Sequence, residues 1–296
     1  MDIYTLDLNF QNVPQTIASY LIKGPDGPVL VETGPGSTLD NLIAQLATHG
    51  LQPADIKHIL VTHIHFDHAG ASGWWAQQGA QIYVHGFGAP HLINPDKLIA
   101  SATRIYGDKM NVLWGDILPA PAEKVTIVND GDVIEAGGLR FTAIETPGHA
   151  RHHHVYRLGD VAFTGDAAGI KIPSFPLVDL PAPPPEFDLE VWETTIDRLI
   201  AENFTAIYPT HFDRVEDVTS HFIELKQLLH VATNWIKEKM DADVTRDDLV
   251  EQFNEWNRSR ARQVGLNDDA IHQYETANPW YMSVDGIMRY WQKKTG

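Results

Sequence analysis

Four side chains of the kinds that bind metal ions fall within six positions of the sequence. The segment VTHIHFDHAG, residues 61–70, contains His63, His65, Asp67 and His68. Imidazole nitrogens and carboxylate oxygens bind zinc and similar ions at about 2.0–2.2 Å. Because His63 and His65 alternate, an extended or turning backbone can direct both at one ion, whereas Asp67 and His68 suit a second. Crowding these groups without an ion would cost desolvation and repulsion with nothing to offset it.

Further candidate ligands follow other strand-like segments. The runs LRFTAIETPGH (139–149), HVYRLGDVAFTGD (154–166) and AIYPTHFD (206–213) each lead into a turn, and these turns carry His149, Asp166 and His211. Functional groups collect at strand ends in layered α/β proteins because several loops converge there. Paired ions about 3.5–4 Å apart need a bridging carboxylate. The sequence therefore predicts that these three residues complete the metal site.

The elements that position these residues follow from hydrophobic periodicity. The apolar runs 28–34, 56–63 and 79–86 predict strands, and apolar residues at helical spacing predict a helix from residue 39 to Gly50. Beyond residue 215 three amphipathic helices are expected, over 222–236, 241–256 and 278–294. We therefore expect an α/β domain over residues 1–214 and a helical appendage over 215–296.

Composition narrows the class of protein. The formal net charge is −17, which repels phosphate backbones and anionic lipid headgroups, so no nucleic-acid or membrane partner is expected. The sequence has no cysteine, which excludes a thiolate zinc site, a cysteine nucleophile and an iron–sulfur cluster. The N-terminal residues do not have the pattern of a signal peptide and no stretch is long and apolar enough to span a membrane, so a cytoplasmic location is expected.

The motifs THIHFDHAG, TPGHA, FTGDAAG and YPTHF resemble those of the metallo-β-lactamase fold superfamily in order and spacing, over about residues 15–215. The resemblance implies a four-layer αββα sandwich, here with a C-terminal helical appendage. It also implies two divalent metal ions, with zinc expected first and iron or manganese as alternatives. One ion would be held by His63, His65 and His149, the other by Asp67, His68 and His211, and Asp166 would bridge both.

The same resemblance implies a metal-dependent hydrolase in which a metal-bridging hydroxide attacks a small-molecule ester, thioester or lactone. Asp67 and Asp166 would be the catalytic carboxylates, because they hold the ions and orient the hydroxide. Hydroxyacylglutathione hydrolases and lactone hydrolases have this ligand set. Acylhomoserine lactonases usually carry a tyrosine soon after the bridging aspartate, where this chain has Ala167, Ala168 and Gly169, which disfavours that subclass.

Other functions remain open at this stage. A phosphodiesterase acting on a small molecule and a mononuclear-iron oxidoreductase of the persulfide dioxygenase type use the same scaffold. Flavin-coupled di-iron relatives usually have glutamate at the position of His65 and are therefore disfavoured. A non-catalytic scaffold is a further alternative, in which the aromatic-rich helical tail forms an interface, and a homodimer through this tail is expected.

Several features depart from the usual family pattern or have two interpretations. Glu32 in VETG stands where many members have aspartate, an acid that supports the metal ligands from behind. The run His152–His154 could support ligands or contact substrate. The proline-rich stretch 174–188 is expected to be a rigid loop lining the site. In the insert 88–125, Tyr106, Trp114, Arg104 and Lys109 could form a pocket wall or ordinary helix faces.

Overall fold

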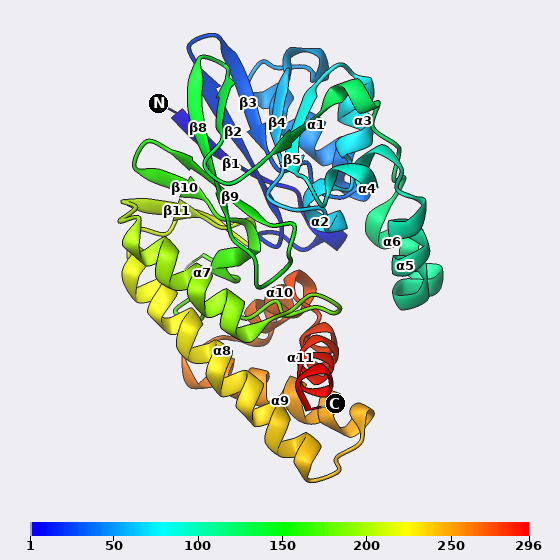
Figure 1. The fold of residues 1–296 in the computed structure, drawn as a ribbon, viewed down its shortest axis with the longest axis vertical. Coiled ribbons are helices and arrows are strands. Elements are labelled where there is room, and N and C mark those ends of the chain that lie inside the picture. The colour runs from blue at the N-terminus through cyan, green and yellow to red at the C-terminus, as the bar shows by residue number, and fades with distance from the viewer. Residues whose placement is uncertain (1, 174, 296) are drawn as a thin grey trace.

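Two β-sheets form the centre of the fold in the computed structural model, which describes residues 2–173 and 175–295 (Figure 1). The first sheet has the order β1 (Asp2–Asp7), β2 (Ala18–Gly24), β3 (Gly27–Val31), β4 (His58–Leu60), β5 (Gln81–His85) and β6 (Val125–Val128). The second has the order β11 (Ala206–Tyr208), β10 (Val161–Phe163), β9 (His154–Leu158), β8 (Leu139–Glu145) and β7 (Val133–Ala136). Strands β3 to β6 run parallel, as do β10 and β11, and the other neighbouring strands pair antiparallel.

The helices of the N-terminal half are α1 (Leu39–Thr48), α2 (Phe66–Ala69), α3 (Ser72–Gln77), α4 (Ala89–Ile93), α5 (Asp96–Tyr106) and α6 (Met110–Trp114). Those of the C-terminal half are α7 (Leu189–Ala201), α8 (Val218–Asp241), α9 (Arg246–Gln263), α10 (Asp268–Ala277) and α11 (Trp280–Thr295). Helices α5 and α6 lie at the side of the molecule, whereas α7 to α11 gather beyond the second sheet (Figure 1). Within the part of the chain described, no helix is long and apolar enough to cross a membrane.

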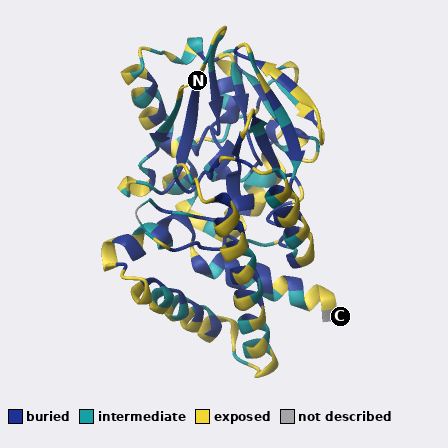
Figure 2. Ribbon diagram, turned by 90° about the vertical axis from the view of Figure 1, so that its left-hand side faces the viewer, coloured by how far each residue is buried: buried dark blue, intermediate teal, exposed yellow. Residues whose placement is uncertain are grey.

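Three apolar cores separate four layers. Side chains alternate along a strand, so Leu21 and Leu30 face the first helical layer while Tyr20 and Val31 face the second sheet. The core between the sheets also contains Phe141, whereas Leu42 of α1 and Trp75 of α3 belong to the outer core of the first sheet. Accordingly, most strand residues at the centre of the sandwich are buried, as the dark blue colour in Figure 2 shows. The predicted αββα sandwich with a C-terminal helical region is thus confirmed.

The C-terminal helices complete the fourth layer. Ala162 and Ile207 of the second sheet share one continuous core with Trp192 of α7 and with Phe222 and Leu225 of α8. Apolar side chains from α9, α10 and α11 extend this core. The appendage is therefore packed on the sheet through shared apolar contacts, and the boundary at residues 214 and 215 stays a prediction.

The predicted three-helix tail was wrong in one respect, because α10 lies between the second and third expected helices. The Asn267 side chain accepts a hydrogen bond from the Ala270 amide and so caps the N-terminus of α10. Ile271 and Tyr274 give the helix a buried face. The other buried residues of this helix are alanine and threonine, so its apolar pattern in the sequence is weak.

Most of the aromatic residues in the tail fill the interior. Trp280 and Tyr290 are buried, and Trp235 and Trp256 pack against the same core. The Trp280 indole N–H donates to the Asp179 carboxylate at 2.8 Å, which satisfies its polar atom inside the fold. These contacts weaken the interpretation of the tail as an exposed aromatic interface, while a homodimer stays a prediction.

Candidate metal centre

All seven predicted ligands lie together at one rim of the sandwich, where strands of both sheets end. His63 and His65 follow β4 of the first sheet, and Asp67 and His68 lie on the short helix α2. In the second sheet, His149 follows β8, Asp166 follows β10 and His211 follows β11. The convergence expected from the strand-end pattern is therefore present.

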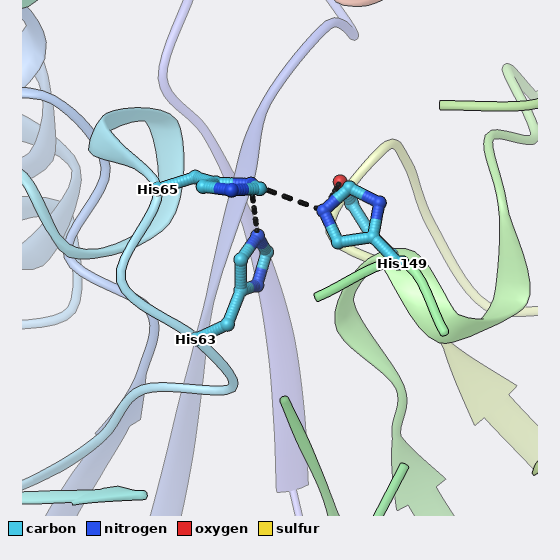
Figure 3. Close-up of side chains that lie close together, drawn as sticks. His63, His65 and His149 are labelled. Carbon is cyan, nitrogen blue, oxygen red and sulfur yellow. Dashed lines mark hydrogen bonds and ion pairs between the residues drawn. The ribbon is translucent and has the colours of Figure 1, made fainter. Parts of the chain in front are cut away.

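The first group consists of His63, His65, His149 and Asp166. Figure 3 shows the three imidazole rings converging, with His65 interacting with both of the others. The Nδ1 atom of His65 lies 2.9 Å from Nε2 of His63 and 3.0 Å from Nε2 of His149. One carboxylate oxygen of Asp166, Oδ2, lies 3.2 Å from Nε2 of His149.

The second group consists of Asp67, His68 and His211. Nε2 of His211 lies 3.5 Å from Oδ2 of Asp67, and Nε2 of His68 lies 3.7 Å from the same oxygen. The other oxygen of Asp166, Oδ1, lies 3.3 Å from Nε2 of His68 and 3.5 Å from Nε2 of His211. Asp166 thus presents one oxygen to each group, which is the arrangement of a bridging carboxylate.

The donor atoms fit divalent ions. Ligand distances of about 2.0–2.1 Å around a tetrahedral ion place neighbouring ligand atoms about 3.3 Å apart, close to the spacings found here. His68 Nε2 and Asp166 Oδ1 are buried and lie 3.3 Å from each other, but neither has a well-aligned hydrogen bond among the described residues. Buried polar atoms without partners are costly, so an ion between these groups would remove that cost.

Hydrogen bonds on the far side of the rings fix their orientation. The Nδ1–H groups of His149 and His211 can donate to the carbonyl oxygens of Pro181 (2.8 Å) and Thr16 (2.6 Å). Each bond leaves Nε2 with its lone pair directed into the site, the tautomer that a metal ligand requires. Since Pro181 belongs to the proline-rich stretch, that loop orients a predicted ligand as well as lining the site. Ser174, at its start, lies outside the described residues.

Glu32 supports both groups from behind. Its carboxylate is buried and its Oε1 accepts from the hydroxyls of Thr62 (2.5 Å) and Thr210 (3.2 Å), and from Nδ1 of His68 (3.3 Å). The Thr62 hydroxyl lies 3.1 Å from Nδ1 of His63, so it can accept from one predicted ligand while it donates to Glu32. The longer side chain of glutamate therefore reaches the supporting position that the resemblance assigns to aspartate.

Burial and neighbouring charges set the protonation of the ligands. Burial lowers the pKa of His63, His149 and His65, the last to about 3, and neutral imidazoles are the form that binds metal ions. Burial raises the pKa of Asp67, but the nearby His68 and the hydrogen bond with His211 outweigh it and lower the value to about 2. Asp67 is therefore ionised at neutral pH and able to bind a cation.

In the second group a proton competes with a metal ion. Burial lowers the pKa of His68 and His211, but the charge of Asp166 outweighs burial and raises both values above 6.5. The same interactions hold the pKa of Asp166 well below its usual range. Without a metal ion, protons on these imidazoles thus balance the carboxylates, and they must leave when a cation binds.

Two glycines allow the backbone to deliver ligands. Gly148, before His149, has φ +130°, and a Cβ there would lie 2.4 Å from the backbone of Trp192. Gly165, before Asp166, has φ +49°, and its Cβ would lie 2.4 Å from the Thr62 hydroxyl. Both positions combine a backbone conformation that favours glycine with close packing.

The turn that carries Asp166 is held by two C-terminal helices. Asp166 lies in the 3-10 helix η6 (Gly165–Ala168). The Trp192 indole N–H of α7 donates to the Ala167 carbonyl at 3.0 Å, and His221 Nε2 of α8 lies 2.7 Å from the Ala168 carbonyl. The helical layer thereby positions the predicted bridging carboxylate.

The buried His221 side chain makes the free energy of unfolding dependent on pH. Burial lowers the pKa of His221 to about 4, outweighing the hydrogen bond to Ala168. Between pH 6.5 and 4 the unfolded chain therefore binds more protons than the folded one, so stability is present above pH 6.5 and is lost as the pH falls. From these two pKa values we expect His221 to account for about 2 kcal/mol of lost stability at pH 5.

Chemical denaturation of chelator-treated protein at pH 7.5 and pH 5.0 tests this expectation. His221→Gln keeps an amide N–H to donate but does not titrate, so its loss of stability between the two pH values should be smaller than that of the wild type. His230→Gln is the control, because His230 lies on the same helix with a half-exposed side chain paired to Glu193. Equal pH dependence in wild type and His221→Gln would contradict the assignment.

The run His152–His154 is divided among three environments. His152 lines the cavity beside the site, with Nε2 3.4 Å from the Glu186 carboxylate. His153 lies behind the site, where its ring stacks on His63 with ring centroids 4.9 Å apart and its Nδ1 bonds the Thr146 hydroxyl at 2.7 Å. His154 is buried against His85. The expected supporting role thus fits His153, and substrate contact fits His152.

A cavity of about 940 Å³ opens over the metal centre. Its floor includes His65, Asp67, His149, Asp166 and His211. The insert forms one wall with Tyr106, Lys109 and Trp114, so the pocket-wall interpretation holds for these three, whereas Arg104 is not a lining residue. The N-terminal loop and the tail also line the cavity, which no motif in the sequence indicated: Phe10, Gln11, Ile17, Thr276, Ala277, Asn278, Pro279, Tyr281 and Met282.

The profile of the metallo-beta-lactamase superfamily matches residues 13–211, which include every predicted ligand. The chain therefore belongs to the metallo-beta-lactamase superfamily. Metal-dependent hydrolysis is the activity that this membership and the site indicate.

Individual relatives share about a third or less of their residues with this chain. The metallo-beta-lactamase fold-containing protein ST1585 of Sulfurisphaera tokodaii is 31% identical over 191 residues, 63% of this chain and 69% of its own length. The lactamase-like protein adaB of Aspergillus niger is 27% identical over 213 residues, 71% of this chain but only 54% of its own length, so the chain spans about half of that relative.

Solved structures extend the fold comparison along the chain. The metallo-beta-lactamase family protein TTHA1429 from Thermus thermophilus superposes with a TM-score of 0.74 at 22% identity, covering 99% of this chain and 94% of its own. ST1585 from Sulfolobus tokodaii gives a TM-score of 0.68 at 21% identity, covering 97% and 98%. At these identities the likeness shows the fold alone.

Proposed function

We propose that this protein is a dinuclear metallohydrolase that cleaves a small-molecule ester, thioester or lactone. The observation that carries the proposal is the carboxylate of Asp166, which presents Oδ2 to His149 in one group and Oδ1 to His68 and His211 in the other. A single ion would leave one of these groups without a cation. The mononuclear-iron alternative is therefore disfavoured.

The residues suit this chemistry. Two bound divalent ions, zinc in our proposal, would act as Lewis acids and lower the pKa of water from 15.7 towards about 7. Asp67 has a side chain that is 22% exposed, and it faces the cavity, where it can orient a water molecule or a substrate hydroxyl. Asp166 and four of the histidines, His63, His68, His149 and His211, are almost fully buried, so they hold their positions as the substrate enters, whereas His65 is partly exposed.

The sequence motifs resemble the ligand set of hydroxyacylglutathione hydrolases and lactone hydrolases, and this resemblance supports testing their classes of substrate first. The first experiment is elemental analysis of untagged protein, followed by assays on a panel of esters, thioesters, lactones and phosphodiesters. Two zinc-like ions per chain with turnover of a carboxylic substrate would support the proposal. One iron per chain would favour oxygen-dependent chemistry on sulfur compounds, and turnover of phosphodiesters alone would favour the phosphodiesterase.

Metal removal should abolish turnover reversibly. Prolonged dialysis against a chelator is expected to remove the ions and to lower the rate by about 10³-fold or more, because a metal centre lowers the barrier by several kcal/mol and each 1.36 kcal/mol is a factor of ten. Adding zinc to the dialysed protein should restore the rate in proportion to the metal bound. Undiminished turnover by protein shown to be metal-free would overturn the proposed function.

A further inference from the structure

The cavity over the metal centre is built mainly from apolar side chains, and its wall is contributed by parts of the chain outside the metal motifs. Helix α5 lines it along one face, with residues 97, 98, 101, 102, 105 and 106. Residues 276–279, 281 and 282, from the end of α10 to the start of α11, also line it. The volume of the cavity, about 940 Å³, is at the upper end of the range of roughly 300–1,000 Å³ that is typical of small-molecule sites.

An aromatic cluster forms the inner part of this wall. The ring of Trp114 stacks on Phe10 with centroids 5.7 Å apart, and it contacts Phe66 at 5.9 Å and Tyr106 at 5.2 Å. All four residues line the cavity, and Phe10, Phe66 and Trp114 are buried. Packed aromatic rings have few conformations, so this part of the wall is rigid and apolar.

Large apolar side chains also lie in the exposed part of the cavity wall, beside the charged Lys97, Lys109 and Arg151. Phe87, Ile105 and Val112 are 57%, 45% and 73% exposed, and all three line the cavity. On α5, Leu98, Ala102 and Ile105 follow one another at helical spacing, a stripe about 10 Å long at 1.5 Å per residue. The apolar surface therefore continues as a narrow strip from the buried Ala102 to the exposed Ile105.

We infer that the substrate carries a linear apolar acyl chain, and that this chain lies along the inner face of α5 while its ester or thioester carbonyl reaches the metal centre. This inference deepens the proposed hydrolase function and rests on it. A strip of apolar side chains that lines the same cavity as the predicted metal ligands and runs to an exposed residue suits an extended hydrocarbon chain. The apolar residues exposed at the mouth then become covered when the substrate binds.

A series of p-nitrophenyl esters from acetate to dodecanoate tests the inference on the metal-loaded protein. Because burying one methylene contributes about 0.8 kcal/mol, kcat/KM of the wild type should rise by about two- to fourfold per added methylene until the cavity is filled. Ala102→Trp places an indole in the strip and should lower kcat/KM for the decanoate at least tenfold more than for the acetate. Ala100→Trp is the matched control, since Ala100 is an exposed alanine of the same helix that does not line the cavity; its profile should match the wild type.

The outcomes separate this inference from the proposed function. Metal-dependent turnover with a kcat/KM independent of chain length, and equal profiles for Ala102→Trp and Ala100→Trp, would overturn the acyl strip and leave the hydrolase intact. If no ester, thioester or lactone is cleaved, the proposed function fails, and calorimetric binding of decanoate then decides on the strip. If decanoate binds, and if Ala102→Trp weakens this binding while Ala100→Trp does not, the acyl strip is supported. If decanoate does not bind, the acyl strip is refuted. Thermal melting and metal content check that both variants fold.

Discussion

Replacing Asp166 with alanine is expected to remove at least one metal ion per chain and to lower turnover by about 10³-fold or more, since several kcal/mol of transition-state stabilisation would be lost. The physical reason is the position of the carboxylate between two groups of imidazoles, with one oxygen for each. Without it, Asp67 is the one carboxylate among the described residues that still lies within 4 Å of Nε2 of both His68 and His211. Elemental analysis and steady-state kinetics measure the two effects.

The matched control is Asp160→Ala. Asp166 follows strand β10, whereas Asp160 precedes it. Asp160 lies in the exposed turn between β9 and β10, at the end of β10 away from the predicted metal site. Its backbone carbonyl, which the substitution keeps, accepts the bond from the Thr205 amide. The control should retain two ions and full turnover. An Asp166→Ala protein that keeps both would contradict the bridging role and, with it, the dinuclear centre.

The predicted metal ligands could be found in the sequence because their signal is local. The spacing of His63, His65, Asp67 and His68 can be read within one turn, and the other ligands each follow a recognisable strand. Parallel and antiparallel strands that end at the same rim bring such turns together whatever the details of packing. The layers could be predicted for the same reason, since period-two and helical apolar patterns identify sheet and helix separately.

The supporting contacts could not be predicted in this way. The carbonyl groups of Thr16 and Pro181 orient His211 and His149, but every residue has a backbone carbonyl, so no side-chain type marks them. The cavity wall combines the N-terminal loop at Phe10, the face of α5 and the segment before α11, which are far apart in the sequence. These segments come together through the packing of the helical layers, and no short sequence motif marks such packing.

For Glu32, the sequence predicted the supporting role but not the residues that it contacts. The VETG turn marked it as a substitute for a supporting aspartate, but its partners became visible only in the fold. Thr210 lies 178 positions away and donates to the same oxygen as Thr62. Through His68 directly, and through Thr62 and His63 indirectly, the carboxylate is connected to both groups of ligands. The longer side chain therefore preserves the support rather than displacing the ligands.

Replacing Glu32 with glutamine should consequently weaken metal binding by about 10- to 100-fold, the usual effect of losing a hydrogen-bonding partner of a ligand. The amide keeps the shape of the side chain but removes the negative charge, and it presents one NH₂ group to donors that need an acceptor. Competition against a chelating dye measures the affinity. At limiting zinc the rate should fall, and a large excess of zinc should restore it, because Glu32 does not line the cavity.

Recovery by zinc separates positioning of the ligands from a general loss of structure. A variant that is merely misfolded would not regain activity when metal is added, whereas a weakened site would refill. Glu145→Gln provides the comparison, since Glu145 also accepts from a histidine, His85 at 3.2 Å, but that histidine belongs to neither metal group. Its metal affinity should equal that of the wild type. If Glu32→Gln binds metal as tightly as Glu145→Gln, the carboxylate contributes only to packing, and the network from Thr210 to His63 does not tune the centre.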